Sequence, residues 1–155
     1  MNEFIKLKLA THVCRVTPIG LAPAAPGTAG AIVGLCLAVA AWQGGFAVYF
    51  LATTFVVFAG TWAAEVYEKT SRTHDDRRIV IDEVAGMMLS LAGWENATVA
   101  IVIAAFVLFR FFDIVKPYPI SWIDKRVGGG VGVMADDLAA GAFTVIALEI
   151  LRPFI

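Results

Sequence analysis

Charged residues are scarce in this sequence: Asp, Glu, Lys and Arg together make up 16% of its 155 residues, whereas about 25% is usual for soluble domains. Hydrophobic residues account for 59% of the chain, and the mean hydropathy is +0.79. So little charge on so apolar a chain excludes an ordinary soluble domain and predicts a membrane protein. The length suits one domain, which we expect to cover residues 1–155.

An excess of positive charge is also missing, because the formal net charge is -1 and the isoelectric point is about 6.1. No nucleic-acid partner is therefore expected. Cysteine is rare as well. Cys14 and Cys36 lack the paired spacing of a metal-binding knuckle or a redox motif, so we interpret both as packing residues.

Apolar runs of full membrane-spanning length are few. A spanning helix needs about 20 apolar residues, and several of the uncharged runs here are shorter. The third run, headed by Asp82 and Glu83, is interpreted as a partial span or as a helix whose first turn is sheltered by protein and not by lipid. The five runs expected to form membrane-embedded helices are 29–43, 46–64, 84–94, 97–112 and 138–151.

The N-terminal stretch, residues 1–16, lacks the long apolar core and the small-residue cleavage site of a signal peptide. It predicts an amphipathic helix on the membrane surface, with large apolar side chains such as Phe4 and Ile5 against lipid and Lys6 and Lys8 toward the headgroups. The expected fold class is therefore all-α: a polytopic membrane bundle of about five embedded helices plus an N-terminal surface helix.

Basic residues alternate between the connecting stretches. Of the 12 Lys and Arg residues, all but Arg152 lie before the first run, between the second and third, or around the link from the fourth to the fifth. Because stretches rich in Lys and Arg stay in the cytoplasm, the N-terminus is expected inside and the C-terminus outside. Most of the acids fall in or beside the same stretches. The pattern predicts an acidic cluster on the cytoplasmic face.

Two pairs of adjacent acids, Asp82 with Glu83 and Asp136 with Asp137, stand at the heads of apolar runs. A structural explanation is that a carboxylate at an N-cap or in a first turn is favoured by the helix dipole. A functional explanation is that the acids together bind a cation. The local pattern alone favours neither explanation.

Asp113 is harder to explain by local structure. It lies near the C-terminal end of its run, just before Lys116 and Pro117, where the helix dipole disfavours a negative charge. Either Arg110 and Lys116 supply the counter-charge, or a divalent metal shared with the other carboxylates does so.

Two glycines sharpen the choice. Gly86 follows Asp82 by four residues and Gly141 follows Asp137 by four, so each glycine shares a helix face with its acid. Small residues allow membrane helices to approach closely, which would bring the acids of the third, fourth and fifth runs together. Carboxylates so placed repel one another unless they are protonated or bridged by metal. All-oxygen ligation favours Mg²⁺, followed by Mn²⁺ or Ca²⁺.

The stretch APAAPGTAGA, residues 22–31, precedes the first run. Its Gly27, Thr28 and Gly30 offer backbone N–H groups and a hydroxyl to an anion at a helix start, although a Pro-Gly turn capped by Thr28 is the more ordinary interpretation. A carboxylate-bound Mg²⁺ beside an anion site, with Arg110 and Lys116 nearby, predicts hydrolysis of a phosphate ester.

Three strings match a known family: APGTAGA at 25–31, HDDRRIVIDEVAG at 74–86 and FRFFDIVKPYPISWIDKRVGGGVGVMADDLAAG at 109–141. Together they resemble the phosphatidylglycerophosphatase A family over nearly the whole chain, from about residue 20 to residue 151. The resemblance implies a Mg²⁺-dependent enzyme of the bacterial cytoplasmic membrane that takes a phospholipid substrate from the bilayer. It would remove the terminal phosphate monoester of phosphatidylglycerophosphate and leave phosphatidylglycerol and inorganic phosphate.

The resemblance also implies residue roles. Glu83 is the preferred general base, and Asp82 and Asp113 are further catalytic residues. Ala31 stands where the Pro-Gly-Thr motif of the family usually ends in Ser, so a hydroxyl is missing there. The implied metal ligands are Asp82, Glu83, Asp113, Asp136 and Asp137. The implied substrate-binding residues are Arg110, Lys116, Thr28 and Gly27.

Two alternatives stay open at this point. The nucleophile is either a water molecule or one of the carboxylates, which would form an aspartyl-phosphate. A rival function of another class is a small cation transporter or channel subunit that uses the carboxylate cluster as an ion site. Against it, the acids gather at one face and no run of polar residues crosses any segment. Cation flux and phosphate release in liposomes distinguish the two functions.

Overall fold

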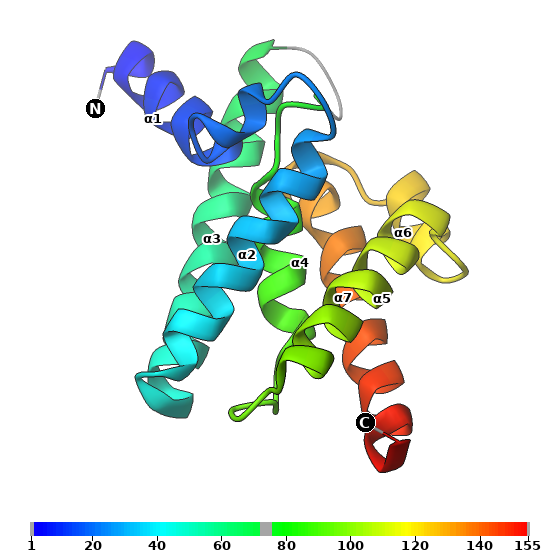
Figure 1. The fold of residues 1–155 in the computed structure, drawn as a ribbon. Coiled ribbons are helices and arrows are strands. Elements are labelled where there is room, and N and C mark those ends of the chain that lie inside the picture. Colours follow the sequence, from blue (N-terminus) through cyan, green and yellow to red (C-terminus); the bar gives the residue numbers. More distant parts are fainter. Residues whose placement is uncertain (1, 72–75, 155) are drawn as a thin grey trace.

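The computed structural model describes residues 2–71 and 76–154. All regular elements in these residues are helices, which confirms the all-α fold class. Figure 1 shows α2, α3, α4 and α7 packed side by side, with α1 across one end of the bundle and the C-terminus at the other. In chain order the elements are α1 (Glu3–Arg15), η1 (Ile19–Leu21), α2 (Pro26–Trp42), α3 (Gly45–Ser71), α4 (Ile81–Ser90), α5 (Val99–Val115), α6 (Ile120–Arg126), α7 (Gly129–Leu151) and η2 (Arg152–Phe154).

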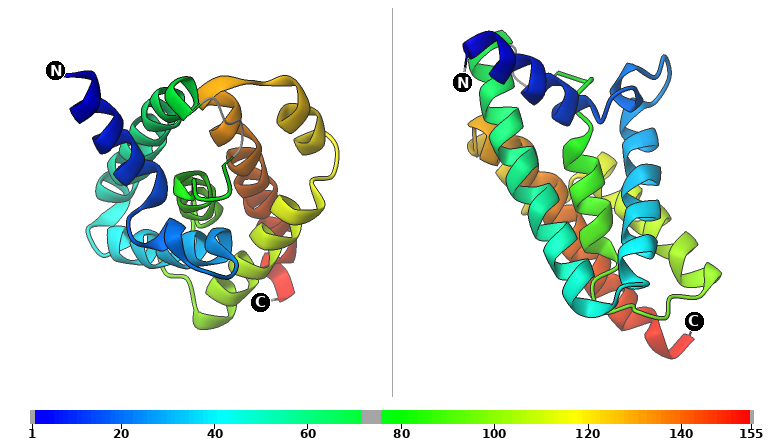
Figure 2. Two further views of the ribbon diagram at one scale, coloured as in Figure 1. Left: turned by 90° about the horizontal axis from the view of Figure 1, so that it is seen from above. Right: turned by 90° about the vertical axis from the view of Figure 1, so that its left-hand side faces the viewer.

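The short helix α4 lies at the centre of the bundle. Viewed along the bundle, it is enclosed by the other helices (Figure 2), and most of its residues are buried. Its 10 residues rise about 15 Å, half of the hydrocarbon core of a bilayer, which is about 30 Å thick. The structure therefore confirms the interpretation of the third run as a helix that protein shelters.

The buried C-terminal end of α4 receives hydrogen bonds from two aromatic side chains. The Tyr49 hydroxyl donates to the Met88 carbonyl oxygen at 2.5 Å, and Trp42 Nε1 donates to the Leu91 carbonyl oxygen at 3.2 Å. The two rings stack on each other with centroids 4.3 Å apart. A helix that ends inside a bundle needs such partners, because its last carbonyl groups are buried among other helices.

Glycines let the backbones of α2 and α7 touch α4. A Cβ added to Gly141 would lie 2.4 Å from the Gly86 carbonyl oxygen, and one added to Gly86 would lie 2.5 Å from that of Asp137. On the opposite side, a Cβ on Gly34 would lie 2.5 Å from the Val84 carbonyl oxygen. No side chain fits into such separations. The close approach predicted from Gly86 and Gly141 is therefore confirmed.

Two helical segments, Gly45–Ser71 and Gly129–Phe154, are long and apolar enough to cross a membrane. The helices α2 and α5 are apolar but shorter, with 17 residues each, or about 25 Å. Each of the five predicted runs does form a helix, namely α2, α3, α4, α5 and α7. Five membrane-embedded helices are nevertheless not confirmed, because among residues 2–71 and 76–154 only the two segments meet the length and hydropathy expected of a full span.

The last helix begins earlier than predicted, at Gly129 and not at residue 138. Its first glycines pack against α3, since a Cβ on Gly130 would lie 2.2 Å from the Thr61 carbonyl oxygen. Glu65 of α3 accepts a hydrogen bond from the Gly130 N–H at 2.7 Å and so satisfies the start of α7. The glycine-rich string thus belongs to a helix interface. The seven-residue helix α6 was not predicted, because it is too short to show a period.

The N-terminal helix α1 is confirmed. Its N-cap Asn2 accepts a hydrogen bond from the Phe4 N–H at 3.2 Å, and Ala10 and Cys14 are buried against the bundle. Phe4 and Ile5, in contrast, are 70% and 55% exposed. Large apolar side chains left exposed on a helix that crosses the end of the bundle suit contact with a membrane surface.

Candidate active site

A cavity of about 450 Å³ opens at the end of the bundle where α2 and α4 begin and α5 ends. Six carboxylates and three cationic side chains line it, including all five of the acids predicted to bind metal and both predicted cationic ligands of phosphate. The charged residues of the wall are Asp82, Glu83, Asp113, Asp124, Asp136, Asp137, Arg77, Arg110 and Lys116. The structure therefore gathers on one cavity acids that are up to 55 positions apart in the chain.

Three of these acids, Asp82, Glu83 and Asp137, form a compact triad. One carboxylate oxygen of each lies within 4.8 Å of those of the other two. Glu83 Oε2 and Asp137 Oδ2 are buried, and neither accepts a hydrogen bond within the part of the chain that the structure describes. Buried carboxylate oxygens without a partner are costly, and three carboxylates that face one another, two of them with such an oxygen, are typical of a cation site.

The helices explain how these acids are positioned. Asp82 and Glu83 lie in the first turn of α4, where the helix dipole favours them, and the Glu83 N–H donates to Asp82 Oδ1 at 3.1 Å. The structural explanation therefore holds for this pair, and the functional one stays a prediction. Asp136 and Asp137 lie about two turns inside α7, so an N-cap role is wrong for them. Adjacent residues on a helix point about 100° apart, which separates the two acids.

Asp136 binds Lys116 and not the triad. Lys116 Nζ donates to Asp136 at 2.6 Å and to Asp124 at 2.5 Å. Burial disfavours the charged ammonium, but the hydrogen bonds to both carboxylates outweigh that effect and raise the pKa of Lys116 above its usual range. Lys116 thus joins the end of α5 to α6 and α7 across the cavity wall.

Asp113 has its counter-charge within the same helix. Arg110 Nη1 donates to Asp113 Oδ2 at 2.5 Å, and both side chains are mostly buried in the cavity wall. The i,i+3 ion pair confirms that Arg110 supplies positive charge where the dipole of α5 disfavours Asp113. Both residues still face the cavity, and whether they contact substrate or metal stays a prediction.

Gly27 lets the Glu83 carboxylate lie against the start of α2. A Cβ added to Gly27 would lie 2.0 Å from Glu83 Oε1 and 3.6 Å from Arg110 Nη1. Any side chain at this position therefore pushes the Glu83 carboxylate out of its place. The close approach also brings a negative charge to the positive end of the α2 dipole.

We predict that Gly27→Ala lowers phosphatase activity by about tenfold or more, because a misplaced reactive group costs up to about a hundredfold. Protein stability should change little, because the clashing atom is the end of a flexible side chain and can move. The rate of phosphate release and the thermal unfolding midpoint in detergent check this. Gly128→Ala is the matched control, since a Cβ at Gly128 meets no atom within 4 Å among the described residues. Equal activity of both variants would contradict the prediction.

The loop before α2 differs in detail from expectation. The helix begins at Pro26 without a side-chain capping bond, so the predicted cap by Thr28 is wrong. Thr28 lies in the first turn of α2 but not among the residues that line the cavity, whereas Ala25, Pro26 and Gly27 do line it. A contact of this loop with phosphate would therefore come from the backbone around Gly27.

Residues 12–152 match the family described as phosphatidylglycerophosphatase A. The chain belongs to this family. It is 35% identical over 130 residues to phosphatidylglycerophosphatase A of Haemophilus influenzae, covering 83% of this chain and 80% of the relative. It is 34% identical over 129 residues to phosphatidylglycerophosphatase A of Escherichia coli, covering 81% of this chain and 73% of the relative. No solved structure matches the fold.

Membership of the phosphatidylglycerophosphatase A family makes the protein a phosphoric monoester hydrolase. A further relative carries a different headgroup in its name. A putative phosphatidylinositol-3-phosphatase of Bacteroides thetaiotaomicron is 38% identical over 147 residues, covering 86% of this chain and 87% of the relative. The reaction class is thus common to these relatives, whereas the names differ in the alcohol that bears the phosphate.

The described side chains that line the active-site cavity include more acids than cations. Six carboxylates outnumber three cations among its described lining residues. A phosphate monoester itself carries about 1.5 to 2 negative charges at neutral pH. Two negative partners in one confined space repel each other, so the acids of this wall disfavour a phosphate monoester unless their charge is compensated.

Two charged residues of the cavity wall were not singled out from the sequence. Asp124 belongs to α6, which was not predicted, so no pattern connected it to Lys116. Arg77 was counted only as a basic residue of a cytoplasmic stretch. Its nearness to the Asp82 and Glu83 pair in the sequence was the signal that could have indicated it.

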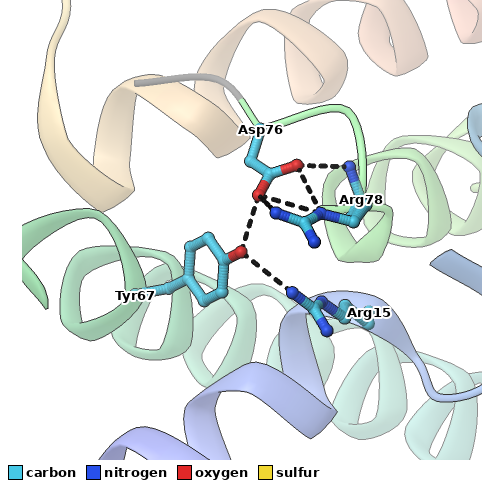
Figure 3. A network of polar contacts seen from close by, with 4 residues as sticks. All are labelled: Arg15, Tyr67, Asp76 and Arg78. Atoms are coloured by element: carbon cyan, nitrogen blue, oxygen red, sulfur yellow. Dashed lines mark hydrogen bonds and ion pairs between the residues drawn. The ribbon is translucent and has the colours of Figure 1, made fainter. Parts of the chain in front are cut away.

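The segment that leads into α4 is fixed by a polar network (Figure 3). Asp76 accepts hydrogen bonds from Arg78 at 2.7 Å and from the Tyr67 hydroxyl at 2.6 Å, and Arg15 donates to that hydroxyl at 3.1 Å. The Arg78 guanidinium holds the pKa of the Asp76 carboxyl well below its usual range, with a smaller contribution from Tyr67. The network joins this segment to α1 and α3 and so sets the start of α4.

Proposed function

We propose that the protein is a Mg²⁺-dependent phosphatidylglycerophosphatase. It hydrolyses the terminal phosphate monoester of phosphatidylglycerophosphate to give phosphatidylglycerol and inorganic phosphate. The observation that carries the proposal is the triad of Asp82, Glu83 and Asp137 on a cavity that Arg110 and Lys116 also line. Glu83 and Asp137 each have a buried oxygen that accepts no hydrogen bond from the described residues. The family supplies the substrate class.

The donor set fits Mg²⁺. The triad offers carboxylate oxygens alone, which a hard cation prefers to nitrogen or sulfur ligands. Asp82, Glu83 and Asp137 would hold the ion, and Asp113 and Asp136 complete the proposed acidic set from the cavity wall. A bound Mg²⁺ would neutralise charge on the phosphate oxygens and lower the pKa of a water molecule.

The side chains of this cavity have separate tasks in the proposed hydrolysis. Glu83 takes the proton of the attacking water, and its free Oε2 is the atom available for that proton. The water oxygen bonds to phosphorus, the bond from phosphorus to the glycerol oxygen breaks, and that oxygen leaves with the proton that Glu83 accepted from the water. Arg110 and Lys116 hold the phosphoryl oxygens, as cations do in phosphoryl transfer. Direct attack by a carboxylate stays the alternative.

We place the active site at the cytoplasmic face of a bacterial inner membrane. The cavity lies at the end of the bundle that α1 crosses, opposite the C-terminus (Figure 1). Nearly all Lys and Arg residues belong to stretches that meet this end, as is typical of cytoplasmic loops. In this placement the acyl chains of the substrate stay in the bilayer while its headgroup enters the cavity.

We predict that purified protein in detergent releases inorganic phosphate from phosphatidylglycerophosphate with Mg²⁺, and that chelation by EDTA reduces the release to background. The physical reason is the negative charge of the cavity, which repels the substrate unless a cation is bound. Readdition of Mg²⁺ should restore the rate. Phosphate assays on the same preparation before and after chelation check this, with phosphatidylinositol 3-phosphate as a second substrate because of the Bacteroides relative.

Three results would contradict parts of the proposal. If phosphate release were undiminished after chelation, the proposed Mg²⁺ dependence would be wrong. Faster release from phosphatidylinositol 3-phosphate would change the headgroup but not the reaction class. No phosphate release together with cation flux in liposomes would favour the rival transport function, in which the acids serve as an ion site.

A further inference from the structure

We propose that a second cavity beside the active site binds the phosphodiester group of the same lipid substrate, and that Arg77 is the residue that holds it. This inference rests on the proposed function, because it needs a substrate with two phosphates. In phosphatidylglycerophosphate the terminal phosphate is a monoester, and a phosphodiester joins the headgroup glycerol to the diacylglycerol. The two groups differ in charge and call for different sites.

The second cavity adjoins the first. It has a volume of about 290 Å³, and it shares Pro26 and Arg77 with the wall of the active site. The remaining lining residues are Gly20, Leu21, Ala22, Pro23 and Arg78. A ligand that extends from one cavity into the other therefore passes Arg77.

The second cavity has the opposite charge to the first. Its described lining includes two arginines and no carboxylate, whereas carboxylates outnumber cations in the active site. Because Arg78 is paired with Asp76 outside this lining, Arg77 supplies the uncompensated positive charge. A phosphodiester carries a single negative charge and needs no metal to be neutralised, because one guanidinium can bind two of its oxygens. Leu21, Ala22 and Pro23 form an apolar rim, and Leu21 is 54% exposed. Such a rim suits the side of the headgroup that continues into the acyl chains.

Arg77 is the cation with its charge available. Arg110 is paired with Asp113 at 2.5 Å and Lys116 with two carboxylates. Arg77, in contrast, is exposed and has no ion pair or hydrogen bond to any residue in 2–71 or 76–154. A guanidinium at the junction of both cavities that no described acid neutralises gains more from binding a phosphate than one paired with a neighbouring acid.

The backbone on either side of Arg77 is held in place. Asp76 and Arg78 belong to the network of Figure 3. The Val80 N–H donates to the Cys14 carbonyl oxygen at 2.8 Å, and a Cβ on Gly20 would lie 2.3 Å from the Arg78 carbonyl oxygen. Arg77 therefore extends from a fixed segment that α1 and η1 contact. A binding side chain so anchored loses less entropy when it orders around a ligand.

The test compares a lipid with both phosphates and a lipid with only the monoester. Short-chain phosphatidylglycerophosphate and short-chain phosphatidic acid are hydrolysed in detergent, and their non-hydrolysable phosphonate analogues are titrated by calorimetry. We expect Arg77→Ala to raise KM and Kd for the two-phosphate lipid by about tenfold, the loss of one charge-assisted contact at an exposed site. The values for phosphatidic acid should stay unchanged, because it has no phosphodiester.

Arg126→Ala is the matched control, because Arg126 is also an exposed arginine of a basic stretch, the one between the fourth and fifth runs, and lines neither cavity. Arg77→Lys should recover part of the affinity, and Arg77→Gln should behave as Arg77→Ala. If Arg77→Ala weakens the affinity for both lipids equally, or for neither, the second site is overturned. Phosphate release by the wild type would still uphold the proposed function. If the wild type hydrolyses neither lipid, the calorimetric titrations decide. Tighter binding of the two-phosphate phosphonate by the wild type than by Arg77→Ala supports the second site, and equal binding by both proteins overturns it.

Discussion

Replacing Asp137 by Asn is expected to lower phosphate release by at least about a hundredfold, because even the residues that support metal ligands cost 10- to 100-fold when mutated. Asn has nearly the shape of Asp but no charge, and Asp137 is only 3% exposed, with its Oδ2 directed at no described partner. The change therefore removes a proposed Mg²⁺ ligand without leaving a hole. Initial rates of phosphate release over a range of Mg²⁺ concentrations check the prediction.

The stability of the Asp137→Asn variant separates a ligand from a merely structural acid. Without metal the three carboxylates of the triad repel one another, so removing one charge should raise the thermal unfolding midpoint in EDTA. With metal the order reverses, because ligand binding stabilises only the protein that binds it. If Asp137 were a merely structural acid, its replacement by Asn would instead lower the unfolding midpoint both in EDTA and with Mg²⁺. Glu95→Gln is the control, an exposed acid outside the cavity.

A companion variant, Glu83→Gln, distinguishes the proposed base from the ligands. If Glu83 mainly accepts the proton of water, turnover should fall while the Mg²⁺-dependent rise of the unfolding midpoint remains. If Glu83 is mainly a ligand, both should be lost, as in Asp137→Asn. Retention of Mg²⁺-dependent stabilisation by Asp137→Asn would remove Asp137 from the ligand set.

Five of the helices, α2, α3, α4, α5 and α7, could be predicted from the sequence because each has its own apolar run. The contact of α4 with α7 could be predicted because Gly86 and Gly141 each follow an acid by four residues. The start of α7 at Gly129 could not be predicted from the sequence. Glycine strings usually indicate turns, and only the position of Thr61 and Glu65 on α3 makes this string a helix interface. The sequence does not contain the missing information, which is the tertiary contact between this string and α3.

The acids of the site were likewise predictable as a set, but not their division of labour. Asp136 and Asp137 are neighbours in the chain, yet one is paired with Lys116 and the other faces α4. Which acid belongs to the triad depends on the rotation of α7 about its axis, and contacts along the whole helix fix that rotation. Arg77 and Asp124 were missed for the same reason: their positions depend on loops and on a short helix without a period.

Gly141→Ala is expected to reduce both stability and activity, although Ala is the better helix former by about 1 kcal/mol. The added Cβ would meet the Gly86 carbonyl oxygen at 2.4 Å, so the backbones of α4 and α7 must separate. Overpacking costs about 1–3 kcal/mol, and the upper part of that range applies because a helix carbonyl cannot turn away. The net loss of about 1–2 kcal/mol should lower the unfolding midpoint by about 5 °C.

Activity should fall further than stability does, by about tenfold or more, because the same separation moves Asp82 away from Asp137. Phosphate release measured well below the unfolding midpoint keeps the two effects apart. Ala142→Leu is the control: Ala142 is the next residue on α7 and is exposed, so the larger side chain points away from α4 and should change neither quantity. A Gly141→Ala variant that unfolds at a lower temperature but retains the full rate would show that the acids are held together by other contacts than the glycine crossing of α4 and α7.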